Sequence, residues 1–255
     1  MIYLYGLLAS ASPASCDAIR SLGGVTGPVD VAVTDMGAIV FGRADAAEFA
    51  PKRRNLLAHA KVLEACQALG DLLPMRFGMT ARDEAEIVRT LRLNRTEIES
   101  QFDRIRGHVE FGLKIAFPRE AALQATIAAD RALDMEYRRL GDMARPPHFA
   151  TAEFGRRLAE ALDRRRTDAQ RRMLPELASL CRDHVLATPE EDVQVLNLHV
   201  LAPPEMGDTL ARAAQAEAAA SGFVPSVDAQ VRLIGPEPPF HFVQVALSTS
   251  STEAA

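Results

Sequence analysis

Residues 72–78 read Leu-Leu-Pro-Met-Arg-Phe-Gly and decide how the first part of the chain folds. Apolar residues stand at every second position from Leu73 to Phe77, which predicts a short strand with one buried face. Pro74 has no backbone N–H to give to a sheet ladder, so we expect this strand at a sheet edge. Arg76 should then point away from the buried face, before the glycine lets the chain turn toward the next helix.

The segments before and after this stretch predict a domain of mixed strands and helices. Alternating or unbroken apolar runs predict strands, and apolar residues at spacings of three and four predict helices. In order, these are strands at 2–9, 29–33 and 38–41, a helix at 52–69, a helix from a Thr80 cap to Gly107, and a strand at 108–117, with a glycine-rich loop at 23–28. This order is that of an α+β domain, in which helices cover a mostly antiparallel sheet.

The second half of the chain predicts a helical region followed by another α+β pattern. Helices are expected at 118–140 and 151–186, strands at 193–201, 227–234 and 240–247, and an Ala-rich helix at 205–220. Pro175 should kink or divide its helix, because proline inside a helix removes a hydrogen bond. We therefore expect an N-terminal domain over 1–117, a helical connecting region over 118–189, a C-terminal domain over 190–247 and a frayed tail over 248–255.

Composition excludes several classes of protein. With 255 residues, 48% hydrophobic and 25% charged, the chain is ordinary for a globular protein. A net charge of −5, three Tyr and no Trp argue against nucleic-acid binding. The arginines within 156–172 alternate with acidic residues, which predicts an ion-paired, solvated helix face. No segment approaches the ~18 apolar residues of a membrane helix, and no signal peptide is evident, so a cytoplasmic location without membrane binding is expected.

Motifs of catalytic and metal sites are missing from the sequence. It contains no Gly-x-Ser-x-Gly, no His-Glu-x-x-His, no P-loop and no Gly-x-Gly-x-x-Gly. Cys16, Cys66 and Cys181 are odd in number and widely spaced, which predicts free thiols. His199 and His241, two histidines in predicted strands, are weak grounds for a metal site without a third ligand. We expect a protein that is not an enzyme, with no catalytic residue, cofactor or metal.

Five blocks of sequence carry a resemblance to a known family. They read Ile2-Tyr3-Leu4-Tyr5-Gly6, His59-Ala60-Lys61-Val62-Leu63-Glu64, Leu73-Pro74-Met75-Arg76-Phe77-Gly78, Val109-Glu110-Phe111-Gly112-Leu113-Lys114 and Gly235-Pro236-Glu237-Pro238-Pro239-Phe240-His241-Phe242-Val243. In this order and at these separations they resemble the gas vesicle protein F and L family. The chain departs from the family at Glu237 and Phe111, where Trp is usual, and at Phe240, where Tyr is frequent.

The resemblance implies a fold and a function. The expected fold is a modified ferredoxin-like N-terminal domain and a ferredoxin-like C-terminal domain. The expected function is that of a minor component or accessory protein of the gas vesicle, which binds the small hydrophobic shell protein (GvpA-like) and other accessory proteins and supports vesicle nucleation and organisation. The alternative is a small-molecule-binding protein or enzyme with a pocket near His59 and Arg76, although a histidine on an apolar helix face is more often a hydrogen-bonded core residue.

The candidate partner-binding residues come from these blocks. They are Met75, Arg76, Phe77, Glu64 and Lys114. Together with Glu110, the charged members form either a docking surface or an internal salt-bridge network that fixes a helix against the sheet. The block at 236–242 also has two readings, because a rigid proline-aromatic turn can seal a core or, where it is exposed, bind a partner at little entropic cost.

Overall fold

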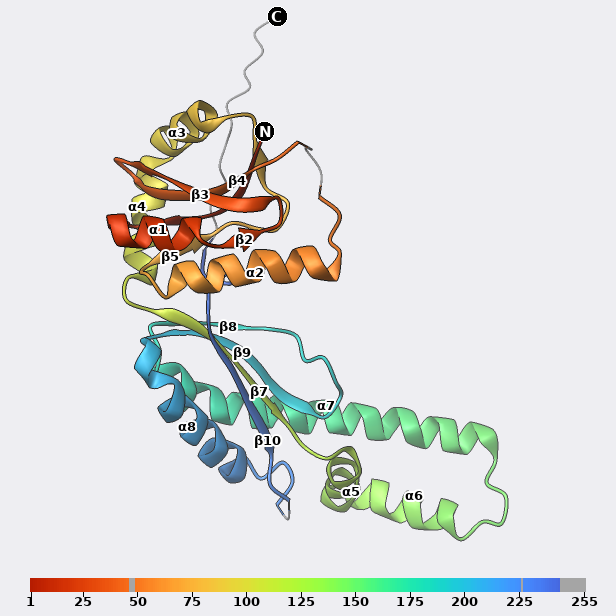
Figure 1. The fold of residues 1–255 in the computed structure, drawn as a ribbon. Coiled ribbons are helices and arrows are strands. Elements are labelled where there is room, and N and C mark those ends of the chain that lie inside the picture. The colour runs from red at the N-terminus through yellow and green to blue at the C-terminus, as the bar shows by residue number, and fades with distance from the viewer. Residues whose placement is uncertain (46–48, 226, 244–255) are drawn as a thin grey trace, which may run out of the picture. The chain divides into compact units, whose positions relative to one another are not determined.

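The computed structural model describes residues 1–45, 49–225 and 227–243 (Figure 1). The chain divides into two compact units, the first made of Met1–Glu110 and Pro236–Ala255 and the second of Phe111–Gly235. The division predicted from the sequence, into domains at 1–117 and 190–247 with a helical connecting region at 118–189, remains a proposal.

Unit 1 is a sheet covered by helices. Its elements are β1 (Ile2–Leu8), α1 (Pro13–Arg20), β2 (Gly23–Gly24), β3 (Gly27–Thr34), β4 (Gly37–Arg43), α2 (Arg53–Gln67), β5 (Leu72–Pro74), β6 (Thr80–Ala81), α3 (Glu84–Leu93) and α4 (Arg95–Ile105). The strand order is β2-β3-β4-β1-β5, with β6 also paired to β1. All seven residues of β1 are buried, as expected for a strand without polar interruptions. The hairpin of β3 and β4 is antiparallel around Thr34 and Gly37, as predicted.

Helices α1 and α2 supply the apolar side chains that cover one face of this sheet. Ile19 of α1 and Val62, Leu63 and Cys66 of α2 join the same core cluster as Tyr3 and other β1 residues. Cys16, Cys66 and Cys181 are free thiols, which confirms the prediction. Burial raises the pKa of the Cys66 thiol to about 12, so Cys66 acts as a small packing residue.

Four predictions for unit 1 are corrected. Helix α1 is absent from the expected elements, although Ser12 caps it by accepting a hydrogen bond from Ser15 N. The residues at 23–28 form β2 and the start of β3, not only a loop. The expected helix from 80 to 107 is two helices, because Asn94 has non-helical backbone angles and separates α3 from α4. Its cap is Asp83, which accepts from Glu86 N, whereas Thr80 lies in β6.

Unit 2 is a second sheet with helices packed against it. Its elements are β7 (Val109–Ala116), α5 (Arg119–Ala129), α6 (Arg131–Gly141), α7 (His148–Ser179), β8 (Asp183–Leu186), β9 (Gln194–Ala202), a short 3-10 turn (Pro204–Met206), α8 (Gly207–Ala220) and β10 (Gln230–Glu237). The first two residues of β7 and the last two of β10 fall in unit 1. The strand order is β10-β7-β9-β8. Helix α7 packs against β9, α5, α6 and α8. The predicted ion-paired face is confirmed in part. Acidic side chains pair with Arg156, Arg157, Arg166 and Arg171, whereas Arg165 and Arg172 donate to the backbone carbonyls of Phe223 and Ser221.

Four predictions for the second half are also corrected. Residues 118–140 form two helices, since the Asp130 side chain accepts from Ala132 N and Leu133 N and starts α6. The expected helix to 186 ends at Ser179, and Pro175 lies inside α7 without dividing it, which leaves the predicted kink untested. Residues 183–186 form β8 instead of the end of a helix. Residues 240–243 are not a strand, and 244–247 and the expected frayed tail at 248–255 lie outside the described residues.

The α+β fold class is confirmed. Pairing is antiparallel between β1 and β4, between β3 and β4 and between β8 and β9, which is consistent with ferredoxin-like domains. In the described ranges, no helix combines the length and the apolar character needed to cross a membrane.

Candidate partner-binding site

The chain leaves the sheet after Pro74 and forms a loop at 75–79, which we call the arginine loop. The strand predicted up to Phe77 therefore ends early, although β5 does lie at the edge of the sheet. Both ends of the loop are tied to β1, because Met75 N donates to Tyr5 O (2.8 Å) and Leu4 N donates to Met79 O (2.9 Å). Gly78 has φ +88°, a backbone conformation that glycine adopts without strain.

A buried hydrogen-bonded chain holds the loop from inside. The Gly78 N–H donates to the Tyr3 hydroxyl (3.3 Å), and that hydroxyl lies 2.9 Å from Nδ1 of His59. Nε2 of His59 lies 3.0 Å from Met75 O, a carbonyl that can only accept. Nε2 therefore carries the proton, and Nδ1 accepts from the Tyr3 hydroxyl. Both ring nitrogens of His59 have partners, as expected of a core histidine.

Burial favours the neutral forms of the His59 and Tyr3 side chains. His59 is only 4% exposed, and desolvation lowers its pKa, with the bond to Met75 O acting in the opposite direction. Desolvation also raises the pKa of Tyr3 to about 12. Desolvation thus favours a neutral imidazole and a neutral phenol, and these forms satisfy the hydrogen bonds described.

Aromatic rings fill the space around the chain. Phe77 packs edge-on against His59 (5.7 Å between centroids) and against Tyr3 (6.0 Å), and Phe49 packs edge-on against Tyr3 (4.9 Å). Tyr5 stacks on His59 (5.4 Å), and its hydroxyl accepts from Val25 N (2.7 Å). These contacts fix the loop from the side opposite to solvent.

Arg76 is exposed at this tied loop, and within the described parts of the chain no acidic side chain pairs with it. The other candidates are placed differently. Met75 is buried (6% exposed) and anchors the loop, Phe77 is half-buried and Glu64 is exposed on α2. Lys114 belongs to unit 2 and pairs with Glu190 (2.6 Å).

Among the residues that the structure describes, Arg76 is not part of an internal salt-bridge network. The carboxylate of Glu110 is buried and accepts from the backbone N and from Nδ1 of His241. Glu110 and His241 are both residue types that bind metals, and within unit 1 the Glu110 carboxylate and Nδ1 of His241 are hydrogen-bonded to each other. Burial, reinforced by the nearby charges of Glu110 and Glu64, raises the pKa of Glu237.

The segment at 236–243 mainly seals unit 1. Pro238, Pro239 and Phe242 are buried, while Phe240 is 42% exposed. The guanidinium of Arg104 lies over the Phe242 ring (5.9 Å), and its Nη1 donates to Phe242 O (2.9 Å). The block at the end of the chain is thus explained chiefly by packing.

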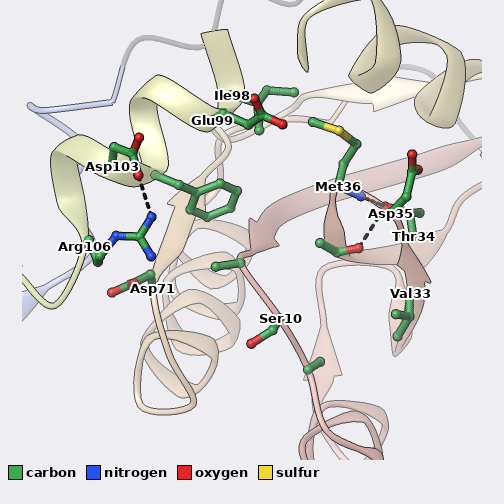
Figure 2. Close-up of a pocket in the computed structure, with 14 residues that line it drawn as sticks. Ser10, Val33, Thr34, Asp35, Met36, Asp71, Ile98, Glu99, Asp103 and Arg106 are labelled. Carbon is green, nitrogen blue, oxygen red and sulfur yellow. Dashed lines mark hydrogen bonds and ion pairs between the residues drawn. The ribbon is translucent and has the colours of Figure 1, made fainter. Parts of the chain in front are cut away.

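A groove of about 560 Å³ opens elsewhere in unit 1, between the β3–β4 turn and α4 (Figure 2). Asp71, Asp103 and Arg106 line one side, and Val33 to Met36 line the other. Figure 2 shows Asp103 facing Arg106, an ion pair that the structure contains. Sequence reasoning missed this groove, because its residues come from four separate stretches of the chain.

Comparison with known proteins agrees with the fold and the sequence blocks. A family model described as gas vesicle synthesis protein GvpL/GvpF matches residues 1–244. Gas vesicle protein F of Streptomyces sp. (strain CB03234) is 29% identical over 256 residues, which cover 95% of this chain and 99% of that protein. Gas vesicle protein F of Dolichospermum flosaquae is 28% identical over 138 residues, 53% of this chain and 55% of that protein.

Solved structures show the same fold. The crystal structure of GvpF from Anabaena sp. PCC7120 has a TM-score of 0.74 at 21% identity and covers 96% of both chains. That of GvpF from Microcystis aeruginosa has a TM-score of 0.72 at 22% identity and covers 96% of this chain and 99% of the other. The match over nearly the whole length, in sequence and in fold, shows that the chain belongs to the gas vesicle synthesis protein GvpL/GvpF family.

Proposed function

We propose that this chain is a non-enzymatic assembly protein of gas vesicles that acts in the cytoplasm and binds the vesicle shell protein (GvpA-like) through its arginine loop. Family membership gives the chain a role connected with gas vesicles. The observation that carries the finer proposal is the exposed Arg76 on a loop whose other side is tied to Tyr3, Tyr5 and His59.

A loop of this kind suits recognition. Its backbone is already fixed by hydrogen bonds to β1, so little conformational entropy remains to be lost on binding. The guanidinium of Arg76 has no acidic partner in the described residues, so it is available to a carboxylate of another protein. The half-buried ring of Phe77 lies next to it and offers apolar contact, while a charge mainly sets orientation and specificity. We also propose that binding at this site supports vesicle nucleation.

Addition of a strand to the sheet edge is not part of this proposal. The three residues of β5 are all buried, so the edge that Pro74 predicted is covered. Side chains of the arginine loop, and not backbone hydrogen bonds along β5, are therefore expected to make the contact.

The arrangement of His59 supports binding rather than catalysis. A general base needs a free nitrogen within reach of a substrate. His59 is 4% exposed with partners on both nitrogens, whereas Arg76 faces solvent. The alternative of an enzyme with His59 and Arg76 in one pocket has no such support.

The experiment is a charge reversal at Arg76 with a matched control. The variant Arg76→Glu should weaken pull-down of co-expressed GvpA-like shell protein and reduce vesicle yield in cells. Because no ion pair with a described residue is lost, its unfolding free energy should change by less than about 0.5 kcal/mol. Arg89→Glu, an exposed position on α3, should change neither binding nor stability.

Two results would count against the proposal. Normal shell-protein binding by a folded Arg76→Glu protein would exclude the arginine loop as the docking site. Loss of binding in parallel with loss of stability would indicate a structural role for Arg76 instead.

A further inference from the structure

We propose that unit 1 associates head to tail with a second copy of this chain, the basic N-terminal end of α2 in one copy entering the groove of Figure 2 in the next. These surfaces are separate from the arginine loop, so the inference does not depend on the proposed function.

The N-terminal end of α2 carries positive charge that the described chain does not neutralise. Lys52, Arg53 and Arg54 are exposed, and none of them is paired with an acidic side chain of a described residue. The first turn holds no acidic residue, and no side chain caps it. Leu56 and Leu57, one turn further on, are 43% and 59% exposed. We call these five residues the basic end.

The groove carries the opposite charge. Its lining includes four carboxylates, those of Asp35, Asp71, Glu99 and Asp103, and one guanidinium, that of Arg106. Arg95 pairs with Asp35 and Glu99, and Arg92 pairs with Asp35 (3.9 Å), so these two guanidiniums and that of Arg106 offset most of this charge. Asp71 accepts a hydrogen bond from Gly107 N (2.8 Å) and interacts electrostatically with the guanidinium of Arg106, which it shares with Asp103.

The charged side chains of helix α2 are placed unfavourably with respect to its dipole. A helix N-terminus is partly positive and its C-terminus partly negative, so cations at the start are unfavourable. The basic end places cations there, the last turn contains no cation, and Asp71 follows shortly after the helix. Contact between the start of one α2 and the groove near the end of another would offset both unfavourable ends.

The two surfaces cannot meet within one copy. Helix α2 has 15 residues, so its ends lie about 22 Å apart at 1.5 Å per residue. Because an unbroken helix is rigid over this length, the basic end can only reach the groove of another molecule. Two different patches make a heterologous contact, which gives a closed ring if the rotation between copies closes and open chains if it does not.

Apolar residues accompany the charges on both sides. Val33 at the groove rim is 63% exposed and Phe102 is half-buried, while Leu56 and Leu57 are exposed at the basic end. Burial of such side chains supplies free energy, and the charges fix which ends meet.

Other occupants of the groove fit less well. A divalent cation needs several oxygens around one point, yet no three groove carboxylates in the described chain lie within 4.8 Å of one another. The last 12 residues contain one Glu and neither Lys nor Arg, so their sequence does not match an acidic groove. An anionic membrane as partner of the basic end is disfavoured by the net charge of −5.

The test is sedimentation velocity of the full chain at a series of concentrations in low and high salt. The basic-end variant is Arg53→Glu with Arg54→Glu, and the groove variant is Asp71→Lys with Glu99→Lys. Each alone should associate at least about tenfold more weakly than the wild type. Since each variant keeps one intact surface, an equimolar mixture should form a heterodimer, which the two altered surfaces, now also of opposite charge, can extend. High salt should weaken wild-type association.

Controls keep the result interpretable. Arg131→Glu with Arg164→Glu makes the same charge change at exposed positions of unit 2, one of them also in the first turn of a helix, and should associate like the wild type. Circular dichroism checks folding, and the gentler Asp71→Asn with Glu99→Gln replaces the groove variant if it does not fold. Wild-type protein that stays monomeric in low salt, or a mixture without heterodimer, would overturn the proposal. A basic-end variant that loses binding to anionic vesicles but associates normally would do the same.

Discussion

The Tyr3 hydroxyl and Nδ1 of His59 lie 2.9 Å apart in the core of unit 1, although 56 positions separate the two residues. This contact joins β1 to α2 and, through Gly78 N and Met75 O, both to the arginine loop. The position of an exposed cation thus depends on a buried polar chain.

Removal of the Tyr3 hydroxyl should destabilise the protein. In Tyr3→Phe, Nδ1 of His59 loses its donor and the Gly78 N–H loses its acceptor while both stay buried, at a cost of about 1–3 kcal/mol. Urea denaturation measures the loss. Tyr137→Phe, at a residue that is 44% exposed, should change stability by less than about 0.5 kcal/mol. Equal stability of the two variants would show that the Tyr3–His59 bond contributes nothing net.

Stability should fall with decreasing pH through His59. The folded state holds its imidazole neutral with a lowered pKa, so below pH ~6.5 the unfolded state binds more protons. The unfolding free energy therefore decreases as the pH falls from about 6.5 toward the folded pKa, by at most about 1.4 kcal/mol per pH unit. Urea titrations between pH 7.5 and 5 should show a flatter profile for His59→Gln. His148→Gln, at an exposed position, should keep the wild-type slope.

The turn of the arginine loop should require glycine for its backbone. Gly78 has φ +88°, and nothing within 4 Å would collide with an added Cβ, so Gly78→Ala tests backbone strain alone. We expect a loss of about 1–2 kcal/mol. Gly155→Ala, in α7 with equally open space, should instead gain about 0.5–1 kcal/mol. A gain at both positions, measured by thermal unfolding, would contradict the assigned strain.

Local signals in the sequence explain what could be predicted of this region. Pro74 placed β5 at the sheet edge, and the alternation around Arg76 correctly predicted an exposed side chain. The predicted strand extends beyond the end of β5 at Pro74, because the position of that end depends on hydrogen bonds that the loop makes with His59 and Tyr3. No local pattern encodes contacts between residues so far apart in the chain.

The missed elements have the same physical origin. Helix α1 buries only Cys16 and Ile19, too few apolar residues to show a helical period, and its start is marked only by Ser12 and Pro13. The groove depends on Asp71 and on residues of the β3–β4 turn and α4, which only the tertiary fold brings together. Single caps such as Asp130 also divided helices whose apolar spacing looked continuous.

In unit 2, Arg165 should stabilise the packing of α7 against the segment after α8. Its Nη1 donates to Thr126 Oγ1 (2.9 Å) and its Nη2 to Phe223 O (2.6 Å), and its guanidinium lies 5.3 Å from the centre of the Phe223 ring. Burial lowers its pKa, which shows that desolvation opposes the charge, so these contacts must offset that cost. Arg165→Met keeps much of the apolar stem but leaves Phe223 O and the Thr126 hydroxyl without this donor, and we expect a loss of about 1.5–3 kcal/mol in urea denaturation. Arg164→Met, at the exposed neighbouring position, should change stability by less than about 0.5 kcal/mol. If Arg165→Met were as stable as the wild type, the guanidinium contacts would only balance their desolvation, and apolar packing alone would hold the helices together.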